Sequence, residues 1–274
     1  MLKEYIEELV KESLRGFSIS KFKAISDNAE RKPEDPGYGE DDIPGYDNVL
    51  MAPEIDYAER YLPMLGEGSS RIVFALSSGK VLKIALNKAG EGQNGEEAEV
   101  WFKSRSPYIT QVYDFSKNNK WIISEIVKPI TEEDVERILE IDKFVFLMFL
   151  AQQPAKLEDI HYVFQTKINY SEDVIETKKA ELEWSDSADE NTKAKLQSDI
   201  EFEEEQANIY RNAISNKVFT EFMSGIINLV NTYSLQWNDI NKNHFGRNVQ
   251  GQIKLLDFGY STNVANDHYS YELS

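Results

Sequence analysis

The sequence contains no cysteine and only three histidines, His161, His244 and His268. Without cysteine, disulfide bonds and thiolate metal ligands are excluded. The histidines are too scattered along the chain for the spacing of a zinc site on one helix or hairpin. A nucleophilic hydrolase has little support, because the chain has neither a cysteine nor a Gly-x-Ser-x-Gly sequence.

Long apolar runs and positive net charge are also missing. The longest apolar stretch, FVFLMFLA at residues 144–151, is too short to span a bilayer. The N-terminus is acidic and amphipathic, unlike the basic and apolar start of a signal peptide. A net charge of −18 disfavours binding to nucleic acids or anionic membranes. We therefore expect a cytoplasmic protein with neither nucleic-acid nor membrane partners.

What is present suits a folded chain of one domain or two small lobes, with 41% hydrophobic residues among 274. Apolar residues at helical spacing predict an amphipathic helix over residues 2–15. Prolines, glycines and acids at 30–48 indicate a linker or an irregular arm. Residues 1–48 are therefore predicted to form an N-terminal helix and acidic arm.

Residues 49–127 are predicted to form a β-rich lobe. After a first strand near residue 62, the runs RIVFAL and VLKIAL flank a Ser-Ser-Gly-Lys turn and predict a hairpin. A short glutamate-rich helix is expected at 95–104. A second hairpin is expected from the strands at 108–116 and 120–128, turning at 117–119.

Residues 128–274 are predicted to be mainly helical, with an acidic insertion at about 160–212. One helix is expected at 131–151, because Thr131 and the acids after it are typical of a helix start. One or two exposed helices are expected within 171–212, and a buried helix at 216–235. The segment WNDINKNHFGRNVQGQIKLLDFGYS (237–261) then predicts an acidic loop, a short hairpin and a second acidic turn.

Gly66 and Gly68 stand before a strand, in the sequence LGEGSSRIVF. Glycines two residues apart let a backbone approach phosphates closely, and free amides there attract negative charge. Taken alone, these residues fit a tight β-turn without a ligand better, since glycine motifs are common in hairpins.

Lys83 lies inside the apolar run VLKIA. A buried lysine is costly unless an acid pairs with it. Glu96, Glu97 and Glu99, on the helix that follows, are natural partners. The alternative is a lysine on the solvent side of an edge strand.

Asp239 and Asp257 stand at opposite ends of the hairpin predicted within 237–261. Each aspartate could simply cap a turn. Two acids at the edges of neighbouring loops are also well placed to share a divalent ion, since Mg²⁺ prefers oxygen ligands and often takes phosphates to complete its shell.

The order of these parts resembles the protein-kinase-like superfamily, which includes aminoglycoside and choline phosphotransferases. The likeness spans roughly residues 62–261 and rests on LGEGSSRIVF, VLKIA, GEEAEV, WIISEIV, WNDINKNHFG and LLDFG. The chain also resembles, more loosely, small kinase-like proteins encoded by tailed bacteriophages, which would place it in a host cytoplasm. The resemblance implies an α+β, bilobal fold with a small antiparallel β N-lobe and a rearranged, truncated helical C-lobe.

The resemblance also implies ATP and Mg²⁺ as cofactors and a role for each motif. Gly66 and Gly68 would cover the phosphates. Lys83 would hold the α- and β-phosphates, with Glu97 as its partner and Glu99 as the second choice. Backbone groups of the hinge would bind adenine. One aspartate would accept the proton of the acceptor hydroxyl, and the other would bind the metal. The residues concerned are Ser124 as gatekeeper, Glu125 and Val127 at the hinge, Asp239 as base and Asp257 as metal ligand.

Three departures from the family pattern affect these roles. Arg71 stands where the third glycine of the loop is expected, and His244 where the family has a metal-binding asparagine. Imidazole suits Mg²⁺ poorly, so Asn243 is the alternative ligand in a tighter loop. Only residues 260–274 follow Asp-Phe-Gly, which predicts that the usual peptide-binding groove is absent.

The sequence is compatible with three functions. The first is an ATP- and Mg²⁺-dependent phosphotransferase acting on a hydroxyl of a small molecule or of a protein that docks in a non-standard way. The second is a pseudokinase, a nucleotide-binding or structural module that transfers nothing. Transfer of AMP in place of phosphate is a third possibility for the same residues.

Overall fold

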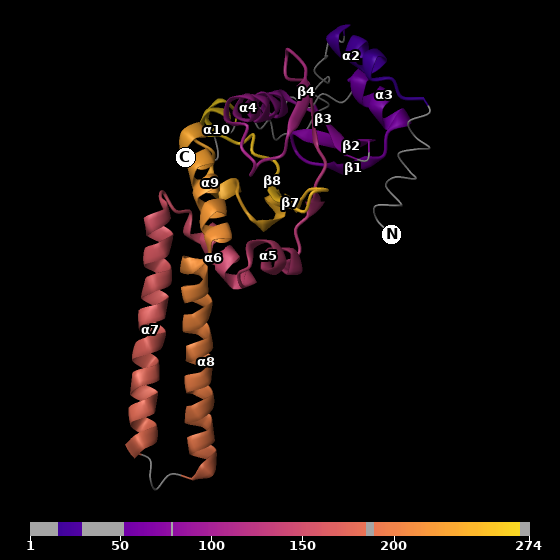
Figure 1. Ribbon diagram of the computed structural model, residues 1–274. Helices are drawn as coiled ribbons and strands as arrows, with labels where there is room; N and C mark the ends of the chain where they lie inside the picture. The colour runs from indigo at the N-terminus through magenta and orange to yellow at the C-terminus, as the bar shows by residue number, and fades with distance from the viewer. Residues whose placement is uncertain (1–15, 29–51, 78, 185–188, 269–274) are drawn as a thin grey trace, which may run out of the picture. The chain divides into compact units, whose positions relative to one another are not determined.

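The computed structural model describes residues 16–28, 52–77, 79–184 and 189–268 (Figure 1). The helix predicted at 2–15 and the arm predicted at 30–48 lie outside these residues. The chain divides into two compact units. The first unit holds the part before residue 130 together with the part from 232 onward, and the second holds residues 130–231.

A five-stranded antiparallel sheet, in the order β1-β2-β3-β5-β4, is the centre of the first unit. Both predicted hairpins are confirmed, since β2 pairs with β3 and β4 pairs with β5. The mixed α+β class with a small antiparallel sheet is thus confirmed as well. The strands are β1 (Met64–Glu67), β2 (Arg71–Ser77), β3 (Lys80–Ala85), β4 (Val112–Phe115) and β5 (Trp121–Glu125).

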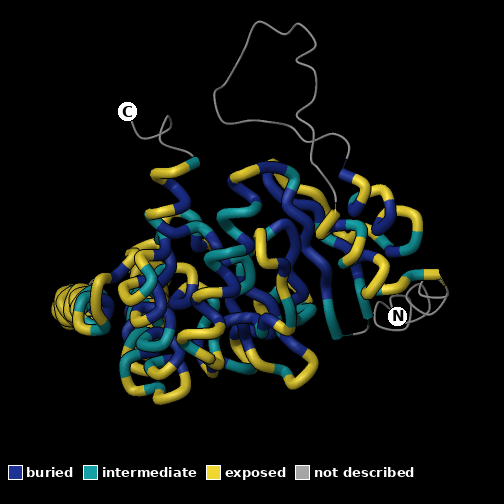
Figure 2. Tube along the Cα trace, turned by 90° about the horizontal axis from the view of Figure 1, so that it is seen from above, coloured by how far each residue is buried: buried dark blue, intermediate teal, exposed yellow. Residues whose placement is uncertain are grey.

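One face of this sheet packs against two helices that the sequence analysis did not predict, α2 (Ile19–Asn28) and α3 (Pro53–Tyr61). The ring of Phe22 on α2 meets Trp121 edge to face, 5.8 Å between centroids. Alternation along the strands sends every second side chain into this core, and the central strands are buried along most of their length (Figure 2). The strand residues of this core are Ile72, Phe74, Leu82, Ile84, Trp121 and Ile123.

The other face of the sheet carries the charged residues. Val73 lies opposite Lys83 in the register of β2 and β3, so Arg71, two residues earlier on β2, shares that face. Helix α4 (Lys88–Ser104) is much longer than the predicted helix at 95–104. Glycines in its first turns hid its start, because glycine disfavours helix.

The start of α4 is fixed by Asn87. Its side-chain oxygen accepts a hydrogen bond from the Gly90 amide at 3.0 Å, and its side-chain nitrogen donates to the Ser69 carbonyl at 2.9 Å. Asn87 therefore caps the helix and also ties it to the turn before β2.

A second sheet, β6-β7-β8, contains the predicted C-terminal hairpin, β7 (Phe245–Arg247) with β8 (Ile253–Leu255). Strand β6 (Lys128–Pro129) pairs with β7. The hairpin is bound to the segment just before β4 through a parallel bridge between Ile109 and Leu255 and a 2.6 Å hydrogen bond from the Lys254 ammonium to the Pro107 carbonyl. These bonds explain why residues from 232 onward group with the β-rich unit, whereas the sequence analysis grouped them with the helices from 128.

The last described element of the first unit is α10 (Thr262–His268), which packs on α4 and was not predicted. Two glycines make close approaches to backbone possible. A Cβ on Gly90 would lie 2.1 Å from the Ser70 carbonyl oxygen, and one on Gly259 would lie 2.4 Å from the Gln93 carbonyl oxygen. Gly259, from Asp-Phe-Gly, thus lets the segment after β8 lie directly against α4.

The second unit is helical. The predicted helix at 131–151 is in fact two helices, because Glu140 takes a left-handed conformation and Asp142 caps a new start. Thr131 and Asp134 form the predicted helix start as a full capping box. The helices are α5 (Glu132–Leu139), α6 (Lys143–Gln152), α7 (Leu157–Trp184), α8 (Glu190–Ser215) and α9 (Lys217–Tyr233), the last of which crosses the boundary between the units.

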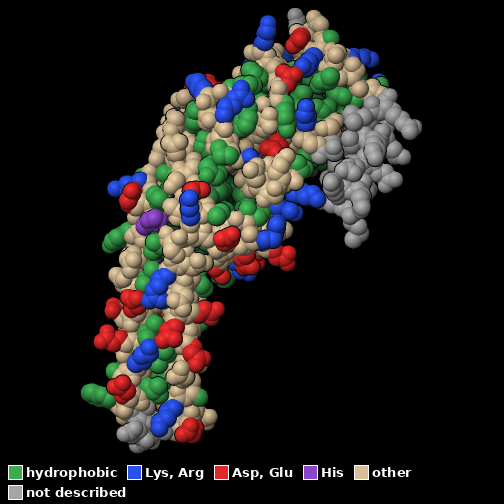
Figure 3. Space-filling model, in the orientation of Figure 1, with side chains coloured by type: hydrophobic (Ala, Val, Ile, Leu, Met, Phe, Trp, Pro, Cys, Tyr) green, Lys and Arg blue, Asp and Glu red, His purple; other side chains and the backbone are tan. Residues whose placement is uncertain are grey.

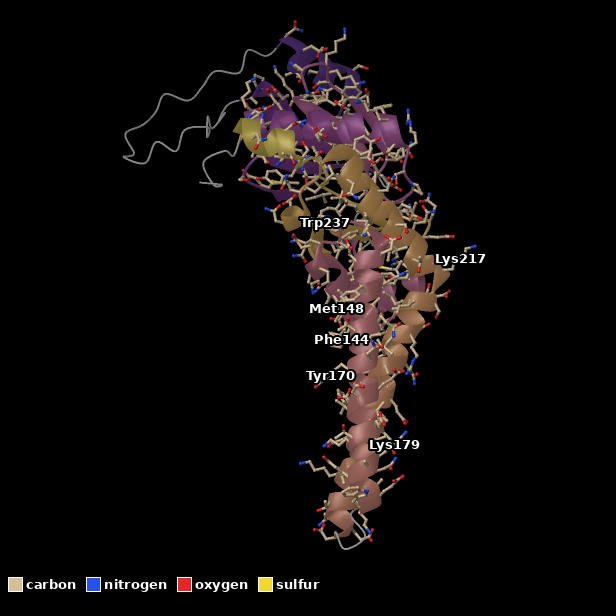
Figure 4. The ribbon with its side chains drawn as sticks, turned by 90° about the vertical axis from the view of Figure 1, so that its left-hand side faces the viewer. Phe144, Met148, Tyr170, Lys179, Lys217 and Trp237 are labelled. Atoms are coloured by element: carbon tan, nitrogen blue, oxygen red, sulfur yellow. The ribbon has the colours of Figure 1, made fainter. Side chains whose placement is uncertain are left out.

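Helices α7 and α8 form a long hairpin where one or two exposed helices were expected. Ion pairs join them, among them Lys178 with Asp199 at 3.1 Å and Lys179 with Glu204 at 3.0 Å. Acidic and basic side chains are interspersed along the face of the hairpin seen in Figure 3. Tyr170 and Lys179 mark the course of α7 in Figure 4. Within the described ranges, no helix has an apolar run long enough to cross a membrane.

The contact at Gly259 gives a stability prediction. We expect Gly259→Ala to lower the free energy of unfolding by about 1–3 kcal/mol, since the added methyl group must push two backbone segments apart. Gly66→Ala is the matched control, because a Cβ there meets nothing within 4 Å. Urea unfolding of both variants measures the difference, and equal losses would show that the close approach is absent.

Candidate functional site

A pocket of about 470 Å³ lies within the first unit, between the glycine turn and the end of β8. Its walls come from β1, β2, β3, the segment after β5, and the loops that carry the two aspartates. The lining includes most of the predicted site residues, namely Gly66, Gly68, Lys83, Ser124, Glu125, Val127, Asp239 and Asp257.

Lys83 and Glu97 form a buried ion pair on the wall of this pocket. The Lys83 ammonium lies 2.9 Å from each carboxylate oxygen of Glu97, and Glu97 is 0% exposed. Glu99, the second choice from the sequence, pairs on the surface with Lys103 instead. Lys83 therefore lies on the inner face of the sheet, and the edge-strand alternative for this residue is wrong.

Arg71 is a second cation on the same carboxylate, and the sequence analysis assigned it no role. Its Nη1 donates to Glu97 at 2.6 Å, and its Nη2 pairs with Asp257. Arg71 is only 7% exposed. One guanidinium thus joins the glutamate of α4 to the aspartate after β8.

These charges act on one another's pKa values. Burial lowers the pKa of the Lys83 ammonium to about 8, aided by the nearby positive charge of Arg71 and opposed by Glu97. Burial alone would raise the pKa of Glu97, yet the charges of Lys83 and Arg71 together hold it below its usual value. Glu97 is therefore ionised at neutral pH, where Lys83 is also mainly protonated.

The two predicted aspartates both line the pocket, at the ends of the β7–β8 hairpin. Burial raises the pKa of Asp239, while the charges of His244 and Arg71 act in the opposite direction. Asp257 has a positive φ of 63°, a conformation that aspartate tolerates better than most residues. Its side chain is 43% exposed and carries the ion pair with Arg71.

Carboxylate oxygens are suitable ligands for Mg²⁺, so Asp239 and Asp257 fit such an ion by donor type. In the described parts of the chain, no three His, Cys, Asp or Glu side chains gather closely enough to hold a metal on their own.

Asn243 and His244, the alternative metal ligands, are not among the residues that line the pocket. Asn243 is exposed, and its amide donates to the side chain of Asn241 at 2.9 Å. The His244 carbonyl accepts a hydrogen bond from the Leu256 amide at 2.8 Å, so its backbone supports the segment just before Asp257. Its Nδ1 is buried, with no hydrogen-bond partner among the described residues.

The predicted hinge borders the pocket at Ser124, Glu125, Ile126 and Val127. The Glu125 amide already donates to the Gln111 carbonyl at 2.8 Å, so that donor is not available to a ligand. Ser124 and Thr110 also line the pocket, and their buried hydroxyl oxygens have no hydrogen-bond partner within the ranges that the structure covers.

The glycine turn forms the outer edge of the pocket. Gly66 pairs with Val73 in the β1–β2 ladder, and the Gly68 amide donates to the Arg71 carbonyl at 2.8 Å. The tight turn expected of these residues is therefore present, and it also borders the pocket. Gln93 of α4, another lining residue that the sequence did not suggest, accepts a hydrogen bond from the Ser70 hydroxyl at 2.8 Å.

No family model matches the sequence, and no curated protein matches it. Among solved structures, the streptomycin–ATP–APH(2'')-IIa ternary complex is similar to this chain at 14% sequence identity and a TM-score of 0.28. The alignment covers 72% of this chain and 65% of the other, so the chain spans less than two thirds of that neighbour.

Glu97 gives the prediction for this site. We expect Glu97→Gln to lower the free energy of unfolding by about 3–5 kcal/mol, because it leaves two buried cations without their shared carboxylate. Glu99→Gln on the same helix should change stability little, because its ion pair is exposed. Denaturant unfolding measures both variants. A Glu97→Gln protein as stable as the control would contradict the buried charge cluster.

Proposed function

We propose that the first unit binds ATP with Mg²⁺ and transfers a phosphoryl group to a hydroxyl acceptor. The observation that carries this proposal is the buried Lys83–Glu97 pair, whose lysine lines one pocket together with Asp239, Asp257 and the glycine turn. A cation and two carboxylates in one pocket are what a triphosphate with a bound metal needs.

Lys83 is the proposed ligand of the α- and β-phosphates. Its ammonium is held by Glu97, which limits its motion and keeps it charged despite burial. The negative phosphates of a ligand would raise the pKa of Lys83 from this lowered value. Positioning and charge neutralisation of this kind supply most of the catalysis in phosphoryl transfer.

The base and the sugar would lie toward the hinge. Apolar side chains of Val73, Val81 and Leu256 line that part of the pocket and could cover the faces of adenine. Val127 and the carbonyl of Glu125 are the proposed backbone partners of the base. Ser124 lines the same pocket, and its hydroxyl, which has no partner among the described residues, is a further proposed polar contact.

Asp239 is the proposed residue that orients the acceptor hydroxyl and accepts its proton. Burial raises its pKa, which moves it toward the range useful for a general base. Asp257 is the proposed ligand of Mg²⁺, which would neutralise charge on the phosphates when bound. Asn243 or His244 as a further metal ligand remains a proposal that requires their loop to move toward the pocket.

The proposed acceptor of the phosphoryl group is a hydroxyl, on a small molecule or on a protein that docks in a non-standard way. Membership of the kinase-like superfamily is part of the same proposal. Cytoplasmic residence, and the looser likeness to bacteriophage proteins, stay predictions from the sequence.

A second candidate function is nucleotide binding without transfer. Two features favour it, namely the ion pair between Arg71 and Asp257 and the imidazole of His244 in place of an asparagine. Both reduce the oxygen ligands available to a metal. Transfer of AMP is compatible with the same residues and is separated from phosphate transfer by the position of the label in ATP.

Nucleotide binding is tested by thermal unfolding with and without Mg·ATP. We expect the melting temperature to rise, with about 2.7 kcal/mol of stabilisation at a ligand concentration of 100 times Kd. Asp257→Ala should reduce or abolish the shift. No shift with any nucleotide would contradict both ATP-dependent functions and leave a structural module.

Transfer is tested with γ-labelled ATP and a panel of hydroxyl compounds and proteins. We expect Asp239→Asn to retain the thermal shift and to lower the rate of label transfer by about 10²-fold or more, because the general base is lost. A matched reaction with α-labelled ATP detects AMP transfer. A wild-type protein that binds Mg·ATP and transfers neither label would support the pseudokinase alternative.

A further inference from the structure

Arg71 occupies a position in the pocket that the proposed function does not use. It begins β2, directly after the glycine turn, and its side chain reaches inward to two carboxylates on different elements. Asn94 of α4 lies 3.5 Å from the same guanidinium. A guanidinium that donates to two carboxylates is held in one orientation, because its planar N–H groups form hydrogen bonds only in fixed directions.

In the proposed function, Arg71 and the metal ion compete for the carboxylate of Asp257. In the structure its carboxylate is paired with the Nη2 of Arg71, and in the proposed function the same carboxylate holds Mg²⁺. The guanidinium and the ion cannot both take the same oxygens, and two cations at one carboxylate repel each other.

The two partners of Arg71 differ in a way that permits exchange. Glu97 is fully buried and binds Nη1 at 2.6 Å, whereas the Asp257 side chain is 43% exposed and binds Nη2. If Arg71 releases Asp257, its charge stays paired with Glu97. Release then avoids the large cost of a buried charge without a partner.

We propose that Arg71 is a built-in competitor of the metal, which holds Asp257 in the free protein and is displaced from it when a divalent cation binds. The proposal rests on the proposed function, because it takes Asp257 as the metal ligand. It deepens that function by making metal binding depend on the breaking of a named ion pair. The ion would bind weakly alone and more tightly with a nucleotide, whose phosphates supply further ligands.

The test measures the affinity for Mn²⁺ by isothermal titration calorimetry, without nucleotide, with the full-length protein and its variants. Mn²⁺ suits the same oxygen ligands as Mg²⁺. We expect Arg71→Met to bind Mn²⁺ about tenfold more tightly than the wild type, as removal of a competing ion pair allows. Arg71→Lys, which keeps the charge, should stay nearer to the wild type.

Two controls make this result specific. Arg137→Met removes a surface arginine that also pairs with an aspartate, Asp134 at 2.8 Å, and should leave Mn²⁺ binding unchanged. Asp257→Asn combined with Arg71→Met should lose the gain in affinity. If Arg71→Met binds Mn²⁺ no more tightly than the wild type, the proposal is wrong, since a purely structural arginine gives that result.

A second test uses the wild type and therefore does not depend on the folding of Arg71→Met. Side-chain NMR signals of ¹⁵N-labelled arginine, with Arg71 assigned from the Arg71→Lys spectrum, report on the guanidinium during titration with Mg²⁺ and a non-hydrolysable ATP analogue. We expect the Arg71 signal to shift as the ion pair breaks. An unchanged signal at saturation would overturn the proposal.

The competition at Asp257 and the nucleotide site can be rejected independently of each other. A wild type that is stabilised by Mg·ATP, with no gain of Mn²⁺ affinity in Arg71→Met, would keep the nucleotide site and reject the competition. A gain in Arg71→Met, with no effect of any nucleotide on the wild type, would keep the competition for Asp257 and reject the nucleotide site.

Discussion

The buried carboxylate of Glu97 is the interaction on which the candidate site depends. It is fully inaccessible to solvent and is stable there because Lys83 of β3 and Arg71 of β2 both donate to it. A buried charge with one partner removed is strongly unfavourable. The three charges therefore hold α4 against the inner face of the sheet, and they fix the direction in which both cations reach the pocket.

Close packing of backbone brings the acidic side of the pocket to these cations. Asn87 ties the start of α4 to the turn before β2, and Gly259 lets the segment after β8 lie against the same helix. The bridge between Ile109 and Leu255 joins the β7–β8 hairpin to the segment that leads into β4. As a result, Asp257 lies within reach of Arg71, although the two are far apart in the sequence.

Much of this arrangement could be predicted from local patterns. Alternating apolar residues indicated both hairpins of the sheet, and a lysine within an apolar strand required an acid from the next helix. Helices α2 and α3 were missed because their sequences are short and mixed in polarity, and their packing on the sheet is a tertiary contact that no local pattern contains. From the sequence, Arg71 was noted only as the residue that replaces the third glycine of the loop. The β2–β3 register places it on the same face as Lys83, but its two partners depend on tertiary contacts that no local pattern contains.

The central claim is that the pocket holds a triphosphate between Lys83 and Asp257. A crystal structure with a non-hydrolysable ATP analogue and Mn²⁺ tests it most directly, because anomalous scattering locates the metal. The account predicts phosphates in contact with the Lys83 ammonium and Mn²⁺ bound to the Asp257 carboxylate, with Lys83 still paired with Glu97. Nucleotide bound elsewhere, or an empty pocket at saturating concentrations of nucleotide and metal, would contradict it.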